Sequence, residues 1–152
     1  MTPTAQPTPN DLCEIYAIER LLSDYAVALN GRDWDHYRSL FSDDATIDYT
    51  SAGGIRGGVA EVSAWVADAF GAFPISQLYI TDKRIDLNGT RATCESSFFE
   101  VALRTGASGE RESLLVGGTY ADEVVKLAVG WRFQTRTEHL GWAHGAMADE
   151  LK

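Results

Sequence analysis

The sequence predicts an α+β domain in which three helices cover one face of a strongly curved sheet. Apolar residues recur at helical spacing in the first 73 residues, whereas the second half consists of β-branched and aromatic stretches separated by turn residues. The 152 residues match the usual size of one domain, and 45% apolar residues suffice for a sizeable core. We expect this domain to span residues 8–143, between a mobile polar arm (1–7) and a C-terminal tail (144–152).

The first helix is predicted to begin after Thr8. Thr8 can cap the helix, Pro9 suits its first turn, and Asp11 can complete a capping box. Asn30-Gly31 should end the helix, because both residues tolerate the left-handed conformation. One buried face is indicated by apolar or aromatic residues at steps of three and four: Ile15, Ile18, Leu22, Tyr25 and Leu29.

The second helix is predicted to be short and to pack against the first. Asp33 is its expected N-cap, residues 34–41 carry its apolar positions, and Ser42-Asp43-Asp44 should close it as a turn. Residues 45–50 are predicted to form a short strand and residues 51–58 a glycine-rich loop. The third helix should follow and stop before Pro74, with this buried stripe: Val59, Val62, Val66, Ala69, Phe70 and Phe73.

Four strands are predicted after Pro74, at residues 77–87, 90–103, 111–121 and 128–140. Asn88-Gly89 is the strongest hairpin signal, because both residues accept the positive φ of a type I′ turn. Four successive strands joined by turns predict an antiparallel meander.

Charge and composition exclude several classes of partner. Thirteen basic against 22 acidic residues give a net charge of −9, which a phosphate backbone or an anionic lipid surface would repel. No apolar run is long enough to span a bilayer, and the first residues lack the layout of a signal peptide. We therefore expect a cytoplasmic protein that binds neither nucleic acid nor membrane.

No metal or cofactor is expected. Cys13 and Cys94 are isolated, and the three histidines lack the spacing of metal ligands. The glycine pairs at 53–54 and 57–58 do not form a phosphate-binding motif.

Several short motifs occur in an order and with a spacing similar to those of the motifs in a known superfamily. They are Tyr25-Ala26, Asn30-Gly31-Arg32-Asp33-Trp34, the run from Leu40 to Tyr49, Gly57, Gly117-Gly118-Thr119-Tyr120 and Gly130-Trp131-Arg132-Phe133. Over residues 12–142 the chain resembles the SnoaL-like branch of the nuclear transport factor 2-like superfamily. The resemblance implies a cone-shaped mixed sheet around a deep apolar pocket that the first helix closes. It leaves function open, because this fold hosts isomerases, dehydratases, cyclases, epoxide hydrolases and binding modules.

The resemblance also assigns positions within that pocket. Tyr25 stands where ketosteroid isomerases and scytalone-dehydratase-like enzymes place a phenol that binds the substrate oxygen, and Tyr49 where scytalone dehydratase has a second tyrosine. However, Asn30 replaces the usual aspartate, Gln77-Leu78-Tyr79 occupies the place of the general-base histidine, and Gly117 replaces a protonated aspartate. The resemblance thus implies that neither standard set of catalytic residues is complete.

Strand alternation on the last strand puts even-numbered residues 132–138 on one face and odd-numbered residues 131–137 on the other. If Arg136 and Glu138 point inward with Glu100, a carboxylate could act as general base and Arg136 could orient an anionic or carbonyl oxygen. Otherwise they form a solvated row of salt bridges.

Other candidates also have two interpretations. The Tyr25 hydroxyl needs a partner, either a ligand or the protein, and Asn30 can end the helix or contact a ligand. Gln77 and Tyr79 can lie at a strand edge or in the pocket, and His139 can be a titrating base or a surface residue.

These observations favour a cofactor-free cyclase, isomerase or dehydratase that performs acid–base catalysis on a hydrophobic, oxygenated molecule such as a polyketide or terpenoid. Tyr25 and Tyr49 would donate hydrogen bonds, Glu138 or Glu100 would move the proton, and Arg136 would orient the substrate. The residues expected to contact substrate are Asn30, Trp65, Gln77, Tyr79, Phe98, Glu100 and Tyr120.

The alternatives are a non-catalytic binding or structural module of the same fold and, third, an epoxide hydrolase. Epoxide opening needs an Asp-Arg-Asp arrangement around a water, of which Arg136 and Glu138 supply only part. We also expect a homo-oligomer, a dimer or trimer, that pairs through the outer face of the sheet.

Overall fold

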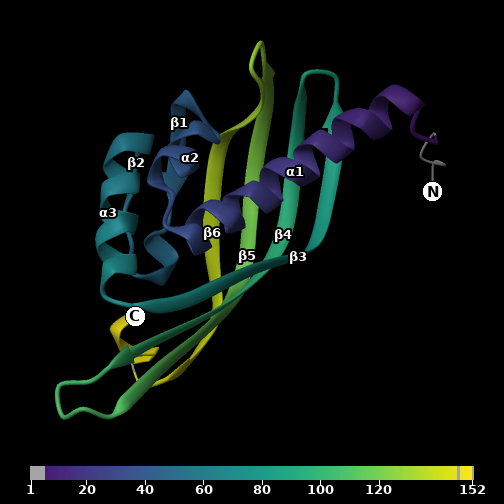
Figure 1. Cartoon of the computed structure of the whole chain (residues 1–152). Coiled ribbons are helices and arrows are strands. Elements are labelled where there is room, and N and C mark those ends of the chain that lie inside the picture. The colour runs from purple at the N-terminus through teal and green to yellow at the C-terminus, as the bar shows by residue number, and fades with distance from the viewer. Residues whose placement is uncertain (1–5, 147, 152) are drawn as a thin grey trace.

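The computed structural model describes residues 6–146 and 148–151, so residues 1–5 of the expected arm lie outside the described residues. Its elements are α1 (Pro9–Gly31), α2 (Trp34–Ser39), β1 (Phe41–Asp48), the 3-10 turn η1 (Thr50–Ala52), β2 (Arg56–Gly57), α3 (Val59–Gly71), β3 (Ile75–Asn88), β4 (Arg91–Thr105), β5 (Arg111–Leu127), β6 (Gly130–Gly145) and the 3-10 turn η2 (Ala148–Leu151). The six strands form one sheet in the order β2-β1-β6-β5-β4-β3, in which only the β1–β6 pair is parallel. Figure 1 shows α1 crossing one face of the long, bending strands, with α2 and α3 beside one end of α1. The predicted α+β class, with its curved mixed sheet, is confirmed.

The start of α1 and its end at Gly31 are confirmed, whereas the left-handed residue lies one position later than predicted. The Thr8 side chain accepts the Asp11 backbone N–H, and the Asp11 carboxylate accepts the Thr8 N–H at 2.8 Å, which completes the capping box. The left-handed residue at the other end is Arg32, with φ 56°, rather than Asn30 or Gly31. Its guanidinium donates to the Ser76 hydroxyl at 3.0 Å and the Phe73 carbonyl at 2.7 Å, so tertiary contacts hold this less favoured backbone conformation.

The second helix is shorter than predicted. Asp33 caps it as expected, but β1 begins at Phe41, so the proposed helical end and the turn at Ser42-Asp43-Asp44 are wrong. Phe41 is paired with Phe133 of β6, and the register shifts between Phe41 and Thr46. Pairing with a distant strand therefore overrides the local turn tendency of the two aspartates.

The four-strand meander is confirmed, with a different first turn. Asn88 pairs with Arg91, so the loop residues are Gly89 and Thr90. Only Gly89 has positive φ (61°), which is the pattern of a type II′ turn and not the predicted type I′ turn. At the other end of the meander β6 extends to Gly145, and η2 follows it.

A β-bulge in β6 changes which side chains face inward. Phe133 pairs with Val124 and Thr135 with Glu123, which leaves Gln134 as an extra residue. Phe133 before the bulge and Arg136 after it are therefore both fully buried. The strict even–odd division predicted for this strand is wrong, and the bulge places Arg136 and Glu138 on the same inner side as Phe133.

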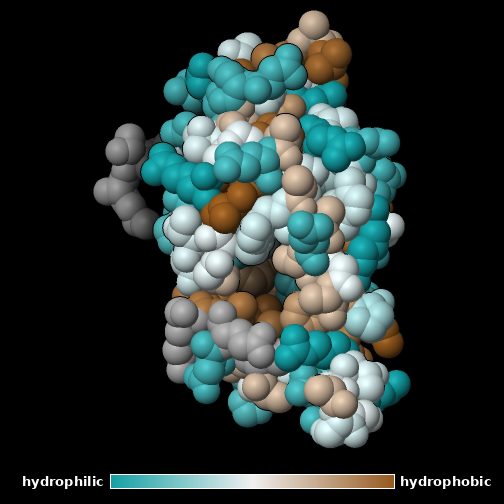
Figure 2. All heavy atoms as spheres, turned by 90° about the vertical axis from the view of Figure 1, so that its left-hand side faces the viewer, coloured by the Kyte–Doolittle hydropathy of each residue, from teal (hydrophilic) through white to brown (hydrophobic). Residues whose placement is uncertain are grey.

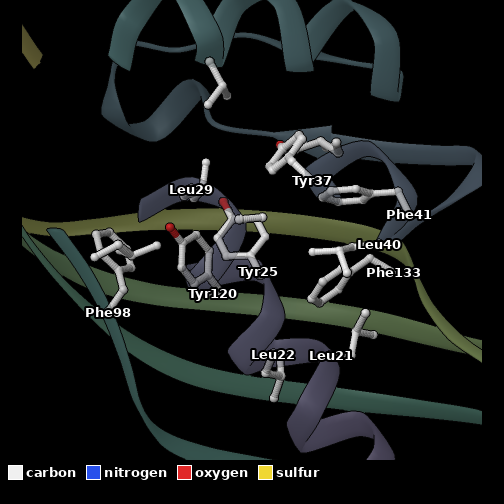
Figure 3. Close-up of a cluster of buried hydrophobic side chains, with 14 of the residues drawn as sticks. Leu21, Leu22, Tyr25, Leu29, Tyr37, Leu40, Phe41, Phe98, Tyr120 and Phe133 are labelled. Atoms are coloured by element: carbon white, nitrogen blue, oxygen red, sulfur yellow. The ribbon is translucent and has the colours of Figure 1, made fainter. Parts of the chain in front are cut away.

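The core consists of aromatic and aliphatic side chains between α1 and the sheet. Figure 3 shows Tyr25 and Tyr120 side by side, with Phe98 beyond Tyr120 and Phe133, Tyr37 and Phe41 on the other side of Tyr25. In the described part of the chain, no helix is long and apolar enough to cross a bilayer.

Candidate active site

A cavity of about 140 Å³ lies between α1, α3 and the inner face of β3–β6. Its walls are largely apolar, with Leu29, Trp65, Phe70, Phe98 and Leu140 among them. Figure 2 shows the hollow on one side of the molecule, with hydrophobic atoms around its floor. A cavity of this size in a protein core accommodates a molecule of about the size of benzene.

Few polar side chains reach this cavity, and strand alternation places most of them. Glu100 stands between Phe98 and Ala102 on the inner face of β4, Tyr120 comes from β5, and Glu138 follows the bulge on β6. Tyr25 is contributed by the buried face of α1, and Tyr49 directly follows β1. The cavity therefore combines apolar walls with three phenols, two carboxyl groups and the Ser76 hydroxyl.

Two of these phenols, Tyr25 and Tyr49, form a hydrogen-bonded chain with Tyr37, which does not line the cavity. The Tyr25 and Tyr49 hydroxyl oxygens are 2.6 Å apart, and those of Tyr37 and Tyr49 are 3.0 Å apart. Burial raises the pKa of Tyr25 to about 12, although the Arg136 charge and the hydrogen bond with Tyr49 lower it. The phenols are therefore protonated at neutral pH. Tyr25 also has a hydrogen bond with Tyr120, so a ligand oxygen can accept a hydrogen from this chain in place of one of its internal partners.

The two carboxyl groups have pKa values near neutrality. Burial, and then repulsion from Glu138, raise the pKa of Glu100 to about 7. Burial also raises the pKa of Glu138 to about 7, against the opposing effects of a hydrogen bond from Tyr120 and of the Arg136 charge. Because the two groups interact, they titrate as a pair. At neutral pH the pair can both accept and donate a proton.

Arg136 does not line the cavity but lies behind its phenols. Its Nε and Nη2 atoms are 3.0 Å and 3.1 Å from the two carboxylate oxygens of Asp122, and both side chains are fully buried. The guanidinium carbon is 3.9 Å, 4.1 Å and 4.4 Å from the ring centres of Tyr25, Tyr120 and Phe133. The expectation that Arg136 orients the substrate by direct contact therefore does not match the structure, because the aromatic rings lie in between.

The remaining candidates divide into two groups. Besides the tyrosines and glutamates described above, Trp65 and Phe98 line the cavity as expected. Gln77 and Tyr79 are exposed on the outer side of β3, because alternation turns Ser76 and Leu78 inward. His139 is also exposed. The side chains that sequence reasoning missed are Tyr37, which appeared only as an apolar helix position, and Asp122, which no motif marks.

Asn30 does not line the cavity either, because its amide binds the backbone of Leu78. It donates to the Leu78 carbonyl at 3.0 Å and accepts the Leu78 N–H at 2.7 Å, which attaches α1 to β3.

Asn30→Ala should lower the free energy of unfolding by about 1–2 kcal/mol through loss of these two hydrogen bonds. Urea titration measures this loss, with Asn10→Ala at the exposed start of α1 as the control. A stable Asn30→Ala variant with weakened ligand binding would contradict this assignment.

The raised carboxyl pKa values also predict how stability depends on pH. Glu100 and Glu138 change from an ordinary value of 4.5 to about 7 on folding, and burial raises the pKa of Asp122 from 3.8 to about 6. The folded state thus binds more protons than the unfolded state in this range, so stability is lost as pH rises from about 4.5 to about 7. We expect a higher urea midpoint at pH 5 than at pH 8, and a smaller difference in Glu100→Gln. A higher midpoint at pH 8 would show that these carboxyl groups are ordinary.

Within the described residues, no three His, Cys, Asp or Glu side chains form a group able to hold a metal ion.

Several known proteins are similar to this chain in sequence or in fold. A model of the SnoaL-like domain family matches residues 10–137. An uncharacterized protein of Mycobacterium tuberculosis is 30% identical over 122 residues, which are 80% of this chain and 81% of that protein. Among solved structures, a protein of Novosphingobium aromaticivorans named as a candidate scytalone dehydratase is similar, with a TM-score of 0.80, 24% identity and 91% of both chains covered. The hexachlorocyclohexane dehydrochlorinase LinA-type3 of Novosphingobium barchaimii has a TM-score of 0.73 at 18% identity, with 88% of this chain and 90% of that chain covered. At these identities the two solved structures show a shared fold.

Proposed function

The chain belongs to the SnoaL-like domain family, and from this premise we propose that its cavity is the active site of a cofactor-free acid–base enzyme. The substrate is a hydrophobic, oxygenated small molecule, and the reaction is an isomerisation, cyclisation or dehydration that begins with removal of a proton next to a carbonyl group. The observation that carries the proposal is the placement of Glu138 in the same apolar cavity as the hydroxyls of Tyr25 and Tyr49.

The phenols and Glu138 suit the two parts of such a reaction. A hydroxyl of the Tyr25–Tyr49 pair can donate its hydrogen to the substrate oxygen, where negative charge develops as the proton leaves carbon. Glu138 accepts that proton, since a carboxylate with a pKa of about 7 is a stronger base than one with an ordinary value. The resulting enol can take the proton back at another carbon, attack a second carbonyl or expel a leaving group.

Glu138 is assigned as the base and Glu100 as the group that holds the shared proton. Tyr120 donates a hydrogen bond to Glu138, and the Arg136 charge also favours its ionised form. The cation that lowers the pKa of Glu100 is Arg32, whose guanidinium already binds Ser76 and Phe73. When one proton is shared by the pair, these interactions favour its location on Glu100.

Charge limits the class of substrate. Among the described residues that line the cavity, Glu100 and Glu138 are the charged ones, and both are acidic. A carboxylate-bearing ligand would meet repulsion there, whereas a neutral ketone would not. Polyketide- or terpenoid-like compounds with a single ring in the cavity fit these limits. The Arg136–Asp122 pair lies outside the cavity, which disfavours the arrangement that epoxide opening needs.

Hydrogen–deuterium exchange tests the proposal without knowledge of the natural substrate. Cyclohexanone and cyclopentanone are incubated with the protein in deuterated water, and loss of the hydrogens next to the carbonyl is followed by proton NMR. We expect saturable exchange above the buffer rate. A ketone that binds in the cavity without exchange would instead support the alternative, a non-catalytic binding module.

We also propose a homo-oligomer that pairs through the outer face of the sheet. Tyr79, Phe99 and Trp142 form a row of aromatic side chains there, with ring centres 6.5 Å and 5.9 Å apart, and Tyr79 and Trp142 are about half exposed. Burial of this row between two copies would remove apolar area from water. Sedimentation at micromolar concentration should therefore give a dimer or trimer, and a monomer of 16.6 kDa would overturn the proposal.

A further inference from the structure

The buried pair of Arg136 and Asp122 is not explained by packing alone. Both side chains are fully buried, and their closest nitrogen–oxygen distance is 3.0 Å. Replacement of such a pair by apolar residues is often neutral or stabilising, because desolvation of two charges offsets their attraction. A charge at this position therefore calls for a role other than stability.

The position of the guanidinium suggests that role, because it contacts groups that line the cavity. Its carbon is 3.9 Å from the ring centre of Tyr25 and 4.1 Å from that of Tyr120. Asp122 accepts a hydrogen bond from Nη2 and lies 3.0 Å from Nε, but neither Nε nor Nη1 has a hydrogen-bond partner among the described residues although both are buried. Part of the positive charge is therefore not neutralised by a hydrogen bond.

A positive charge in this place favours the negatively charged forms of all the groups around it. Arg136 lowers the pKa of Tyr25, Tyr49 and Tyr120, and also that of Glu138. A phenol that loses its proton more readily is a stronger hydrogen-bond donor. The same charge keeps Glu138 ionised at a lower pH than its burial alone would allow.

We propose that Arg136 is a positioning residue of the site, which touches no ligand but fixes the rings of Tyr25 and Tyr120 and supplies a positive field to their hydroxyls and to Glu138. Asp122 opposes this field and so sets its strength. The inference rests on the proposed function, since it concerns the groups assigned there as oxygen-binding phenols and base.

Opposite changes in the two members of the pair test this inference. Asp122→Asn removes the negative charge and should lower the midpoint at which Glu138 ionises, by about one pH unit. Asp122→Asn/Arg136→Gln removes both charges but keeps amides that can bind each other, and it should raise the midpoint by a similar amount. Arg132→Gln, on the same strand before the bulge and outside the cavity, is the control and should leave the midpoint unchanged.

Two readouts follow the midpoint. The first is the carbon-13 signal of the Glu138 carboxyl group as a function of pH, and the second is the pH dependence of ketone exchange. The other groups that act on Glu138 are Tyr120 from β5, Glu100 from β4 and Tyr25 from α1, and the variants keep all of them. If the double variant does not fold, Arg136→Lys serves as the second variant. It keeps the charge and should keep the midpoint, while loss of the planar ring contact lowers kcat more than it raises KM.

Midpoints that stay at the wild-type value in the two Asp122 variants, or that move in the same direction, would overturn the inference. If Arg136→Lys is used as the second variant, a rise of its midpoint by about one pH unit would also overturn the inference, because lysine retains the positive charge and should keep the midpoint at the wild-type value. Failure of the proposed function gives a different pattern. The Glu138 carboxyl signal would then shift with opposite signs in the two Asp122 variants, while neither these proteins nor the wild type exchanges the ketones.

Discussion

Glu138→Gln should reduce ketone exchange by about 10²- to 10⁴-fold, the usual contribution of a positioned general base. Glutamine has nearly the shape of glutamate and can still accept the hydrogen bond from Tyr120, but its amide cannot take a proton from carbon. The variant should fold, and it should gain stability above neutral pH because a buried charge is removed. Initial exchange rates with cyclohexanone at pH 8 measure the loss.

Glu100→Gln is the matched control for this variant, because Glu100 lies in the same cavity and has a similarly raised pKa. The substitution removes the repulsion between the Glu100 and Glu138 carboxylates. Ketone exchange should therefore be retained at pH 8, and the midpoint of its pH dependence should move to lower pH. A large loss in Glu100→Gln together with a normal rate in Glu138→Gln would assign the base to Glu100.

Tyr25→Phe should lower exchange by about 10²-fold, the effect of removing one hydrogen-bond donor from a developing oxyanion. The ring is retained, so its contacts with Arg136 and the edge-on packing against Tyr120 and Phe133 remain. Tyr49 loses its partner at 2.6 Å, which should change the free energy of unfolding by no more than about 1 kcal/mol. The prediction therefore separates turnover from stability.

Tyr37→Phe is the control for the phenol chain. The Tyr37 hydroxyl binds Tyr49 at 3.0 Å, but Tyr37 does not line the cavity. Its loss should affect exchange much less than that of Tyr25, since the Tyr25–Tyr49 pair still has a hydrogen to donate. Equal rates in Tyr25→Phe and wild type would remove Tyr25 from the mechanism and favour a binding module.

Local signals in the sequence were sufficient for much of the fold. The Thr8–Asp11 capping box, the Asp33 cap and the four-strand meander depend on residues close in sequence, and each is confirmed. The start of β1 at Phe41 was missed, because that strand forms by pairing with β6, about 90 residues away.

The candidate site was only partly predictable for the same reason. The buried stripe of α1 correctly placed Tyr25 inside, but alternation could not show which face of β6 is buried, and the bulge at Gln134 changes the alternation partway along the strand. The partner of Arg136 is Asp122, on the neighbouring strand, and no local motif connects them. Asn30 looked like a pocket residue because of its place in a family pattern, yet its amide binds the Leu78 backbone.

The pH dependence of ketone exchange by the wild-type protein tests the central claim most directly, since the claim is that Glu138 in an apolar cavity acts as a base with a raised pKa. The rate should rise between pH 5 and pH 9 with a midpoint near 7, and this rise should be absent in Glu138→Gln. A rate that is already constant from about pH 6, as an ordinary glutamate with a pKa of 4.5 would give, or an equal rate in Glu138→Gln, would contradict it.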